Sequence, residues 1–224
     1  MRLSEILFSK VKEIWDVSVS KPFVIEMAKG TLDEGLFKHY MIQDYLYLQD
    51  YIGILKRIRD ISGEEEITCF LDSIIDETIS EVERVHIPNM NELGISEDDI
   101  VKTGKLNVIS EYTEFMRKCI DEHGMLGGLT GMLQCSWVYA YISKTSLSEY
   151  REEISKSKYH SWFEDYSCDS YVNTNRMWID FLDKQSAGID EAKTDELCRI
   201  FVRCAGFENE LWDALYNLKM AFRS

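Results

Sequence analysis

The sequence predicts an all-α protein, a single-domain helical bundle that spans residues 1–224. Apolar residues recur at the spacing of an α-helix in most segments, and no segment of strand length alternates between apolar and polar residues. The chain contains only two prolines, Pro22 and Pro88, and neither a linker nor a repeat. Its 224 residues and 45% hydrophobic content are sufficient for one large core.

The first half of the chain predicts three helices. Residues 1–15 form an amphipathic helix that lacks the apolar region of a signal peptide. The motif TLDE predicts a capping box, with Thr31 as N-cap and Glu34 at the third helical position, and its helix runs to about Asp60. Residues 63–87 form the next long helix, which we expect to end before Pro88, because proline disfavours a helical conformation in the residue that precedes it.

The second half is also helical. Residues 106–120 carry an amphipathic stripe, and further helices are expected at 159–166, 170–184 and 194–205. Gly206 is predicted to break the chain before a last helix at 207–222. The uncharged stretch 124–143 is about as long as a bilayer requires, but its glycines and polar side chains favour a buried central helix over a membrane span.

The charge and the cysteines narrow the classes of partner. A formal net charge of −15 and a pI near 4.7 argue against nucleic acid and anionic membranes as partners. The six cysteines form no CxxC pair, and no secretory signal precedes them. We therefore expect reduced thiols in a cytoplasmic protein rather than a disulfide framework.

The segment MIQDYLYLQDYIGIL, residues 41–55, places a carboxylate and two phenols where a core helix ordinarily has leucine or valine. At about 100° per residue, Asp44, Tyr47 and Tyr51 fall within roughly 60° of one another and share a face. Tyrosines recur on other inward stripes, at Tyr112, Tyr139 and Tyr166. Each can be simple packing, but together with Asp44 they suit a pocket for a flat, nitrogen-bearing ring.

Two further residues have both a structural and a chemical interpretation. Cys135, in the uncharged helix with Tyr139 four residues later, is either a small core residue or a nucleophile. Glu208 begins an apolar stripe that continues through Leu211 and Leu215 to Phe222. It is either a first-turn glutamate favoured by the helix dipole or a partly desolvated carboxyl suited to proton transfer.

Metal and haem ligation find little support. The motif ERVH is one Glu-x-x-His pair, Glu83 and His86, whereas carboxylate di-iron bundles need two such pairs and two further glutamates. The chain has no second pair. A haem ligand at His39 is weaker still, because one histidine on an amphipathic helix normally packs or faces water. We therefore expect neither a metal nor a haem.

Several motifs resemble those of the TenA/thiaminase II family. Residues 22–51 resemble its N-terminal signature, and later landmarks follow in order over nearly the whole chain: EVERVH, CSWVYAYI, Trp162 with Tyr166, and ENELWDALY. Lys21 and Leu211 depart from the family pattern, where a histidine and an aromatic residue are usual. The resemblance implies a haem-oxygenase-like all-α fold, a homotetramer, and cleavage of a C–N bond at the methylene group of a 4-amino-2-methylpyrimidine.

The resemblance also implies roles for individual residues. Asp44 would bind the pyrimidine, Cys135 would be the nucleophile, and Glu208 would transfer protons. The tyrosines would complete the pocket: Tyr47, Tyr51, Tyr112, Tyr139 and Tyr166. The expected substrates are aminomethyl-pyrimidine, thiamine or both, and the expected product is hydroxymethyl-pyrimidine, in thiamine salvage or degradation, without a cofactor.

Two alternatives stay open from the sequence. One is another haem-oxygenase-like enzyme, either a di-iron oxygenase or a cofactor-free oxidase. Bound iron would identify the di-iron oxygenase. The other is a non-catalytic pyrimidine-binding regulator, against which the intact set of Asp44, Cys135 and Glu208 argues.

Overall fold

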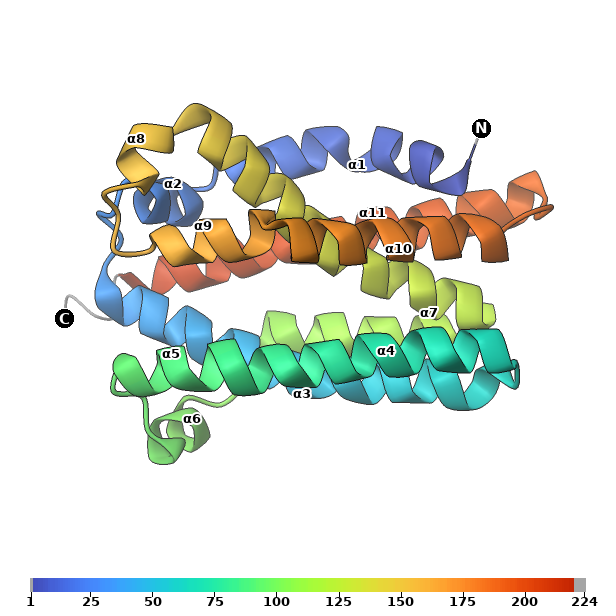
Figure 1. Cartoon of the computed structure of the whole chain (residues 1–224), viewed down its shortest axis with the longest axis horizontal. Helices are drawn as coiled ribbons and strands as arrows, with labels where there is room; N and C mark the ends of the chain where they lie inside the picture. Colours follow the sequence, from blue (N-terminus) through green and yellow to red (C-terminus); the bar gives the residue numbers. More distant parts are fainter. Residues whose placement is uncertain (1, 220–224) are drawn as a thin grey trace. The chain divides into compact units, whose positions relative to one another are not determined.

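The computed structural model shown in Figure 1 describes residues 2–219. All regular elements among these residues are helical and none is a β-strand, which confirms the all-α prediction. In chain order they are α1 (Leu3–Val19), α2 (Pro22–Ala28), α3 (Glu34–Ser62), α4 (Glu65–Glu81), the π-helix η1 (Val82–His86), α5 (Ile87–Glu92), α6 (Glu97–Thr103), α7 (Asn107–Glu149), α8 (Arg151–Ile154), α9 (His160–Ser167), α10 (Asp169–Gln185) and α11 (Glu191–Asn217).

The described residues form two compact units. The first contains residues 2–32 and 129–217, and the second contains residues 33–128 and 218–219. Helix α7 contributes to both, because it begins in the second unit and ends in the first. Its helical backbone is interrupted at Gly124, where φ is 68° and ψ is −159°. The assignment of residues 1–224 to a single domain stays a prediction.

In the first unit, α1 packs against α10 and α11, and α2 packs against α11 (Figure 1). The ring of Trp15 lies 5.5 Å from that of Trp137 and 6.0 Å from that of Phe201, measured between centroids. The predicted N-terminal amphipathic helix is thus confirmed, and its buried stripe has the spacing of one helix face: Leu3, Leu7, Val11 and Trp15.

In the second unit, α3 is the central element. It packs along α4, as Figure 1 shows, and also contacts η1, α5 and α6. Near the end of α3, Ile58 approaches α7 closely at Gly128. A Cβ atom at Gly128 would lie 2.8 Å from side-chain carbons of Ile58 and Ile120, so a larger residue would force these helices to shift.

The start of α3 differs from the predicted capping box. Asp33, not Thr31, is the N-cap, and its Oδ1 accepts a hydrogen bond of 2.8 Å from the Gly35 N–H. Thr31 instead closes the end of α2, since its backbone N–H donates to the Glu26 carbonyl at 2.8 Å. Aspartate caps a helix as well as threonine does, and the choice depended on where α2 ends. Helix α3 continues past Asp60 to Ser62, with Gly63 in the left-handed conformation after it.

Pro88 does not end the helical path as predicted. Helix α4 ends at Glu81, the π-turn η1 follows, and α5 begins at Ile87 with Pro88 in its first turn. Proline lacks an N–H and collides with the carbonyl four residues before it inside an α-helix, but it is tolerated in a first turn. The wider turn satisfies the backbone here, because the Ile87 N–H donates to the Val82 carbonyl.

Gly206 does not break the last helix, which contradicts the prediction. Helix α11 is continuous from Glu191 to Asn217. Glycine inside a helix costs about 1 kcal/mol relative to alanine, and burial of flanking side chains such as Phe201, Phe207 and Trp212 offsets this cost. Residues 220–222 of the predicted final helix, Phe222 among them, lie outside the described residues.

The uncharged stretch 124–143 lies within α7, and much of it is buried, including Leu129, Leu133 and Gln134. Across residues 2–219, no helix combines the length and the apolar character needed to cross a membrane. The interpretation of this stretch as a buried helix is therefore confirmed.

Candidate active site

The predicted site residues fall into two groups, one in each unit. The second unit holds Asp44, Tyr47, Tyr51 and Tyr112, and the first holds Cys135, Tyr139, Tyr166 and Glu208. The structure brings the rings of Tyr47, Tyr51 and Tyr112 together in the second unit and those of Tyr139 and Tyr166 together in the first, and each group is described separately below.

The residue spacing predicts that Asp44, Tyr47 and Tyr51 share one face of α3. In the structure all three are buried on this helix, and Tyr112 of α7 is buried as well. The centroid of the Tyr47 ring lies 5.8 Å from that of Tyr51 and 5.6 Å from that of Tyr112. The planes of Tyr47 and Tyr112 differ by 30°, so the two rings are tilted against each other. The face of a tyrosine ring can also stack on a further flat ring.

Asp44 is a buried carboxylate beside a histidine. Its Oδ2 lies 3.5 Å from Nδ1 of His86, and Nε2 of the same imidazole lies 3.6 Å from Oε1 of Glu81. Burial raises the pKa of Asp44 to about 6, although the charge of His86 and a hydrogen bond from Tyr40 oppose the rise. Within residues 2–219, Oδ2 accepts no hydrogen bond, so it is available to a donor on a ligand.

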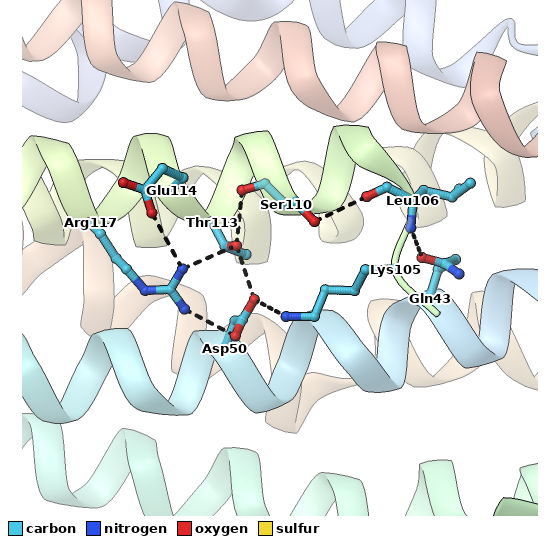
Figure 2. Close-up of polar contacts among 8 residues, drawn as sticks. All are labelled: Gln43, Asp50, Lys105, Leu106, Ser110, Thr113, Glu114 and Arg117. Atoms are coloured by element: carbon cyan, nitrogen blue, oxygen red, sulfur yellow. Dashed lines mark hydrogen bonds and ion pairs between the residues drawn. The ribbon is translucent and has the colours of Figure 1, made fainter. Parts of the chain in front are cut away.

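The residue before Asp44 anchors the loop that leads into α7. Gln43 is buried, and its side chain makes two hydrogen bonds to backbone atoms, donating to the Gly104 carbonyl at 2.7 Å and accepting from the Leu106 N–H at 2.8 Å. Figure 2 shows the second of these bonds. Because Leu106 immediately precedes α7, Gln43 fixes where that helix starts relative to α3.

A charged network ties α3 to the same helix about two turns after Gln43 (Figure 2). Asp50 accepts hydrogen bonds from Lys105 at 2.5 Å and from Thr113 at 3.0 Å, and its other oxygen lies 3.0 Å from Arg117. Burial raises the pKa of Asp50, but the bonds from Lys105 and Thr113 and the two positive charges outweigh it and hold the pKa below its ordinary value. The network therefore holds Thr113, and with it the adjacent Tyr112, against α3.

In the first unit, Tyr139 stands at the centre of an aromatic cluster built from three helices. Its ring centroid lies 4.9 Å from that of Tyr166 on α9, 5.8 Å from that of Trp162 on α9 and 6.0 Å from that of Trp212 on α11. All four side chains are buried. Edge-to-face contacts dominate, which fixes the ring of each residue in one orientation.

Glu208 lies in the interior of α11, not in a first turn, so the dipole explanation for it no longer holds. It is 1% exposed. One turn later on the same helix, Trp212 belongs to the aromatic cluster of Tyr139. The neighbouring Asn209 fixes this part of α11, because it donates to the Ile14 carbonyl at 3.0 Å and accepts from Ser18 at 2.9 Å.

Cys135 is half-buried, in contrast to Cys119, whose pKa burial raises to about 12. The residue after Cys135 fixes its position on α7. Ser136 donates to Asn175 on α10 at 2.8 Å, and the Ser136 carbonyl accepts from the Tyr171 hydroxyl at 3.1 Å. A cysteine that is partly accessible and held on a rigid helix fits a nucleophile better than the fully buried Cys119 does.

The residues weighed as metal and haem ligands, Glu83, His86 and His39, lie in different surroundings. His86 of the ERVH motif lies beside Asp44 and Glu81, while Glu83 is exposed. Within the part of the chain that the structure describes, no three His, Cys, Asp or Glu residues are grouped as metal ligands. His39 is half-buried, and burial lowers its pKa.

Sequence reasoning did not assign a role to three residues that support these groups: Gln43, Asp50 and Asn175. Gln43 could have been found as a buried-face amide next to Asp44. The partners of Asp50 and Asn175 are far away in the sequence, so local spacing held no signal for them. His86 was noticed, but as a metal ligand rather than as a neighbour of Asp44.

Residues 8–218 match the sequence profile of the TENA/THI-4/PQQC family. The chain belongs to this family. The match covers both units and both groups of site residues. The resemblance drawn from the motifs is therefore confirmed.

Two curated relatives match along nearly their full length. The chain is 25% identical to the aminopyrimidine aminohydrolase of Halalkalibacterium halodurans over 221 residues, which are 98% of each chain. It is 24% identical to the aminopyrimidine aminohydrolase of Helicobacter pylori, over 97% of this chain and 100% of that one.

Solved structures show the same fold. A TenA homologue from P. horikoshii is similar with a TM-score of 0.85 at 24% identity, over 97% of this chain and 99% of that chain. A TenA homologue from Pyrococcus furiosus also gives a TM-score of 0.85, at 19% identity, over 96% of this chain and all of that one.

Proposed function

We propose that the chain is a hydrolase that cleaves the C–N bond at the methylene carbon of 4-amino-2-methylpyrimidines and releases hydroxymethyl-pyrimidine. Full-length similarity to aminopyrimidine aminohydrolases supports an enzyme with a role in thiamine metabolism. The observation that carries the proposal is Asp44, a buried carboxylate whose Oδ2 accepts no hydrogen bond within residues 2–219, about one helical turn before the buried Tyr47 on α3.

Asp44 and the tyrosines of α3 and α7 would recognise the pyrimidine. The exocyclic amino group of the substrate donates a hydrogen bond, and an ionised carboxylate is a pure acceptor. A second contact of Asp44 would be to a ring nitrogen, with a proton between the two. Tyr47, Tyr51 and Tyr112 offer ring faces on which the flat heterocycle can stack.

Cys135 and Glu208 would carry out the bond exchange. The thiolate of Cys135 adds to the ring, which loses its aromaticity, and the electron pair expels the amine from the exocyclic methylene. Water then adds at the methylene carbon, and the thiolate leaves as aromaticity returns. Glu208 would give a proton to the leaving amine and accept one from water. The net change breaks one C–N bond, forms one C–O bond and consumes one water. No metal or organic cofactor takes part.

The proposal also concerns which leaving groups the enzyme accepts. All the assigned residues address the pyrimidine ring and its methylene carbon, and the chain is strongly acidic, with no glycine-rich phosphate loop. We therefore expect aminomethyl-pyrimidine to be hydrolysed at least as efficiently as thiamine, and thiamine diphosphate poorly. A pyrimidine without its 4-amino group should fail, because Asp44 would face it without a hydrogen bond in a desolvated position.

Steady-state kcat/KM for these four compounds tests the proposal, with hydroxymethyl-pyrimidine followed by chromatography. Turnover of thiamine diphosphate above the others, or equal turnover of the compound without the amino group, would contradict the assigned recognition. Tight binding of the pyrimidine without any turnover would favour a regulator. Elemental analysis for iron and light scattering in the same preparation would test the di-iron alternative and the expected homotetramer.

A further inference from the structure

His86 lies between two carboxylates in the second unit. Its Nδ1 faces Oδ2 of Asp44 at 3.5 Å, and its Nε2 faces Oε1 of Glu81 at 3.6 Å. The imidazole is buried, with 4% of its side chain exposed. A carboxylate faces each ring nitrogen, and this arrangement favours the orientation of the imidazole in which Nδ1 points to Asp44 and Nε2 points to Glu81.

The π-turn accounts for this arrangement. Glu81 and His86 are five residues apart, and in an α-helix residues five apart lie about 140° from each other around the axis, on different faces. In a π-turn, residue i+5 lies approximately above residue i. The irregular segment Val82–His86 therefore brings His86 over Glu81 and directs it to Asp44 on α3. Single π-turns of this kind occur frequently at functional sites.

The charges around Asp44 act in opposite directions. Burial raises its pKa most strongly, the charge of Glu81 raises it further, and His86 together with a hydrogen bond from Tyr40 lowers it. The groups that act on the carboxylate come from three elements: Tyr40 from α3 itself, Glu81 from the end of α4 and His86 from η1. Among these groups, His86 is the one whose charge lowers the pKa of Asp44.

We propose that His86 is a positioning residue for Asp44: through Nδ1 it orients and keeps ionised the carboxylate that receives the amino group of the substrate, while Glu81 fixes the imidazole through Nε2. The inference rests on the proposed function for its substrate. The pairing of His86 with Asp44 itself stands on the geometry of α3, α4 and η1. Each carboxylate oxygen has two lone pairs, so a contact with His86 leaves capacity for the pyrimidine.

Two substitutions at His86 separate its roles. His86→Leu removes both the donor and the charge, whereas the side-chain amide of His86→Asn keeps a donor where Nδ1 stands. Without the imidazole, the pKa of Asp44 rises, and the acidic limb of kcat/KM moves to higher pH by about one unit, since an opposite charge at this range lowers a carboxyl pKa by about 1–3 units. At neutral pH we expect a loss of about tenfold in kcat/KM for His86→Leu, and a smaller loss for His86→Asn.

Substitutions of the carboxylates supply the matched comparison. Glu81→Gln removes a negative charge near Asp44, so the acidic limb should move to lower pH. Glu83→Gln also removes a negative charge, but from an exposed position two residues further along. It should leave the acidic limb of kcat/KM unchanged. If His86→Leu fails to fold, which circular dichroism would show, His86→Asn decides the question.

A readout independent of activity is the titration of the Asp44 carboxyl carbon by NMR, with its signal assigned by its absence in Asp44→Asn. A titration midpoint that is higher in His86→Leu than in the wild type, with His86→Asn in between, would support the proposal. Unchanged midpoints in both His86 variants would overturn it. If the wild type neither binds nor cleaves aminopyrimidines, the proposed function fails, and the titration still decides whether His86 controls Asp44.

Discussion

The ring of Tyr112 on α7 lies against that of Tyr47 on α3, with centroids 5.6 Å apart and planes 30° apart. Polar contacts hold this pair on two sides. Gln43 fixes the backbone that leads into α7, and Asp50 holds Thr113, the residue after Tyr112 (Figure 2). This pair of rings is therefore positioned by the hydrogen bonds of its neighbours, in addition to its own packing.

Cys135→Ser should lose nearly all turnover while the fold survives. A serine hydroxyl is a far weaker nucleophile than a thiolate unless a strong base activates it. Turnover of aminomethyl-pyrimidine and the circular dichroism spectrum measure the two effects.

Two other cysteines provide controls for that variant. Cys69 is exposed, so Cys69→Ser should change neither activity nor stability. Cys119→Ser should keep activity and lose about 1–3 kcal/mol of stability, because it places a hydroxyl in a buried position. Equal losses of turnover in Cys135→Ser and Cys119→Ser would show that Cys135 is not the nucleophile.

Asp44→Asn should lower kcat/KM by on the order of 10²-fold, because it replaces a carboxylate acceptor with an amide in a buried hydrogen bond. It should also remove the acidic limb that we expect for the wild type near pH 6, because burial raises the pKa of Asp44 to about 6. Kinetics like those of the wild type would place Asp44 outside the site.

The same variant should change the pH dependence of stability. The pKa of Asp44 is about 6 in the folded protein, against an ordinary value of 3.8, so the folded state binds the proton more tightly. The contribution of Asp44 to stability therefore falls as the pH rises from about 4 to about 6, by at most about 3 kcal/mol. Relative to the wild type, Asp44→Asn should gain stability over this interval, measured by urea unfolding at pH 4 and pH 7. If the difference in stability between the wild type and Asp44→Asn were the same at pH 4 and pH 7, this would contradict the raised pKa of Asp44.

Asp50→Asn should lower stability by about 1–2 kcal/mol at neutral pH, because it weakens contacts with Lys105, Thr113 and Arg117 that water partly screens. The pKa of Asp50 is lowered, so this contribution is present above about pH 4 and is lost as the pH falls below it. Asp98→Asn is the control, since Asp98 forms an exposed pair with Lys102 at 3.8 Å. Thermal unfolding of both variants tests the difference; equal shifts would exclude a special role for the network.

Gly124→Ala and Gly53→Ala should change stability in opposite directions. Gly124 has a φ of 68°, a left-handed conformation that costs alanine about 1–2 kcal/mol. Gly53 is exposed within α3, and a Cβ there meets nothing within 4 Å, so alanine should stabilise the helix by up to about 1 kcal/mol. Denaturant unfolding measures both values. A stabilising Gly124→Ala would mean that the interruption of α7 is not required.

The sequence alone determined the helical class and most helices of this protein, because apolar spacing along a helix is a local property. It also determined that Asp44, Tyr47 and Tyr51 share a face, since all three belong to one helix of regular period. It was less successful at boundaries. Thr31, Pro88 and Gly206 each carry a local signal for a start or an end, and each was overridden by the ends of neighbouring helices or by burial.

Only the tertiary structure decided which side chains surround the predicted site residues. The contact of His86 with Asp44 depends on a π-turn, and the network of Asp50 joins residues from two helices and a loop. The interior position of Glu208 likewise required the continuous helix α11. These features arise from packing between segments far apart in the chain, where charge, burial and backbone geometry act together, and no periodicity within a single segment records them.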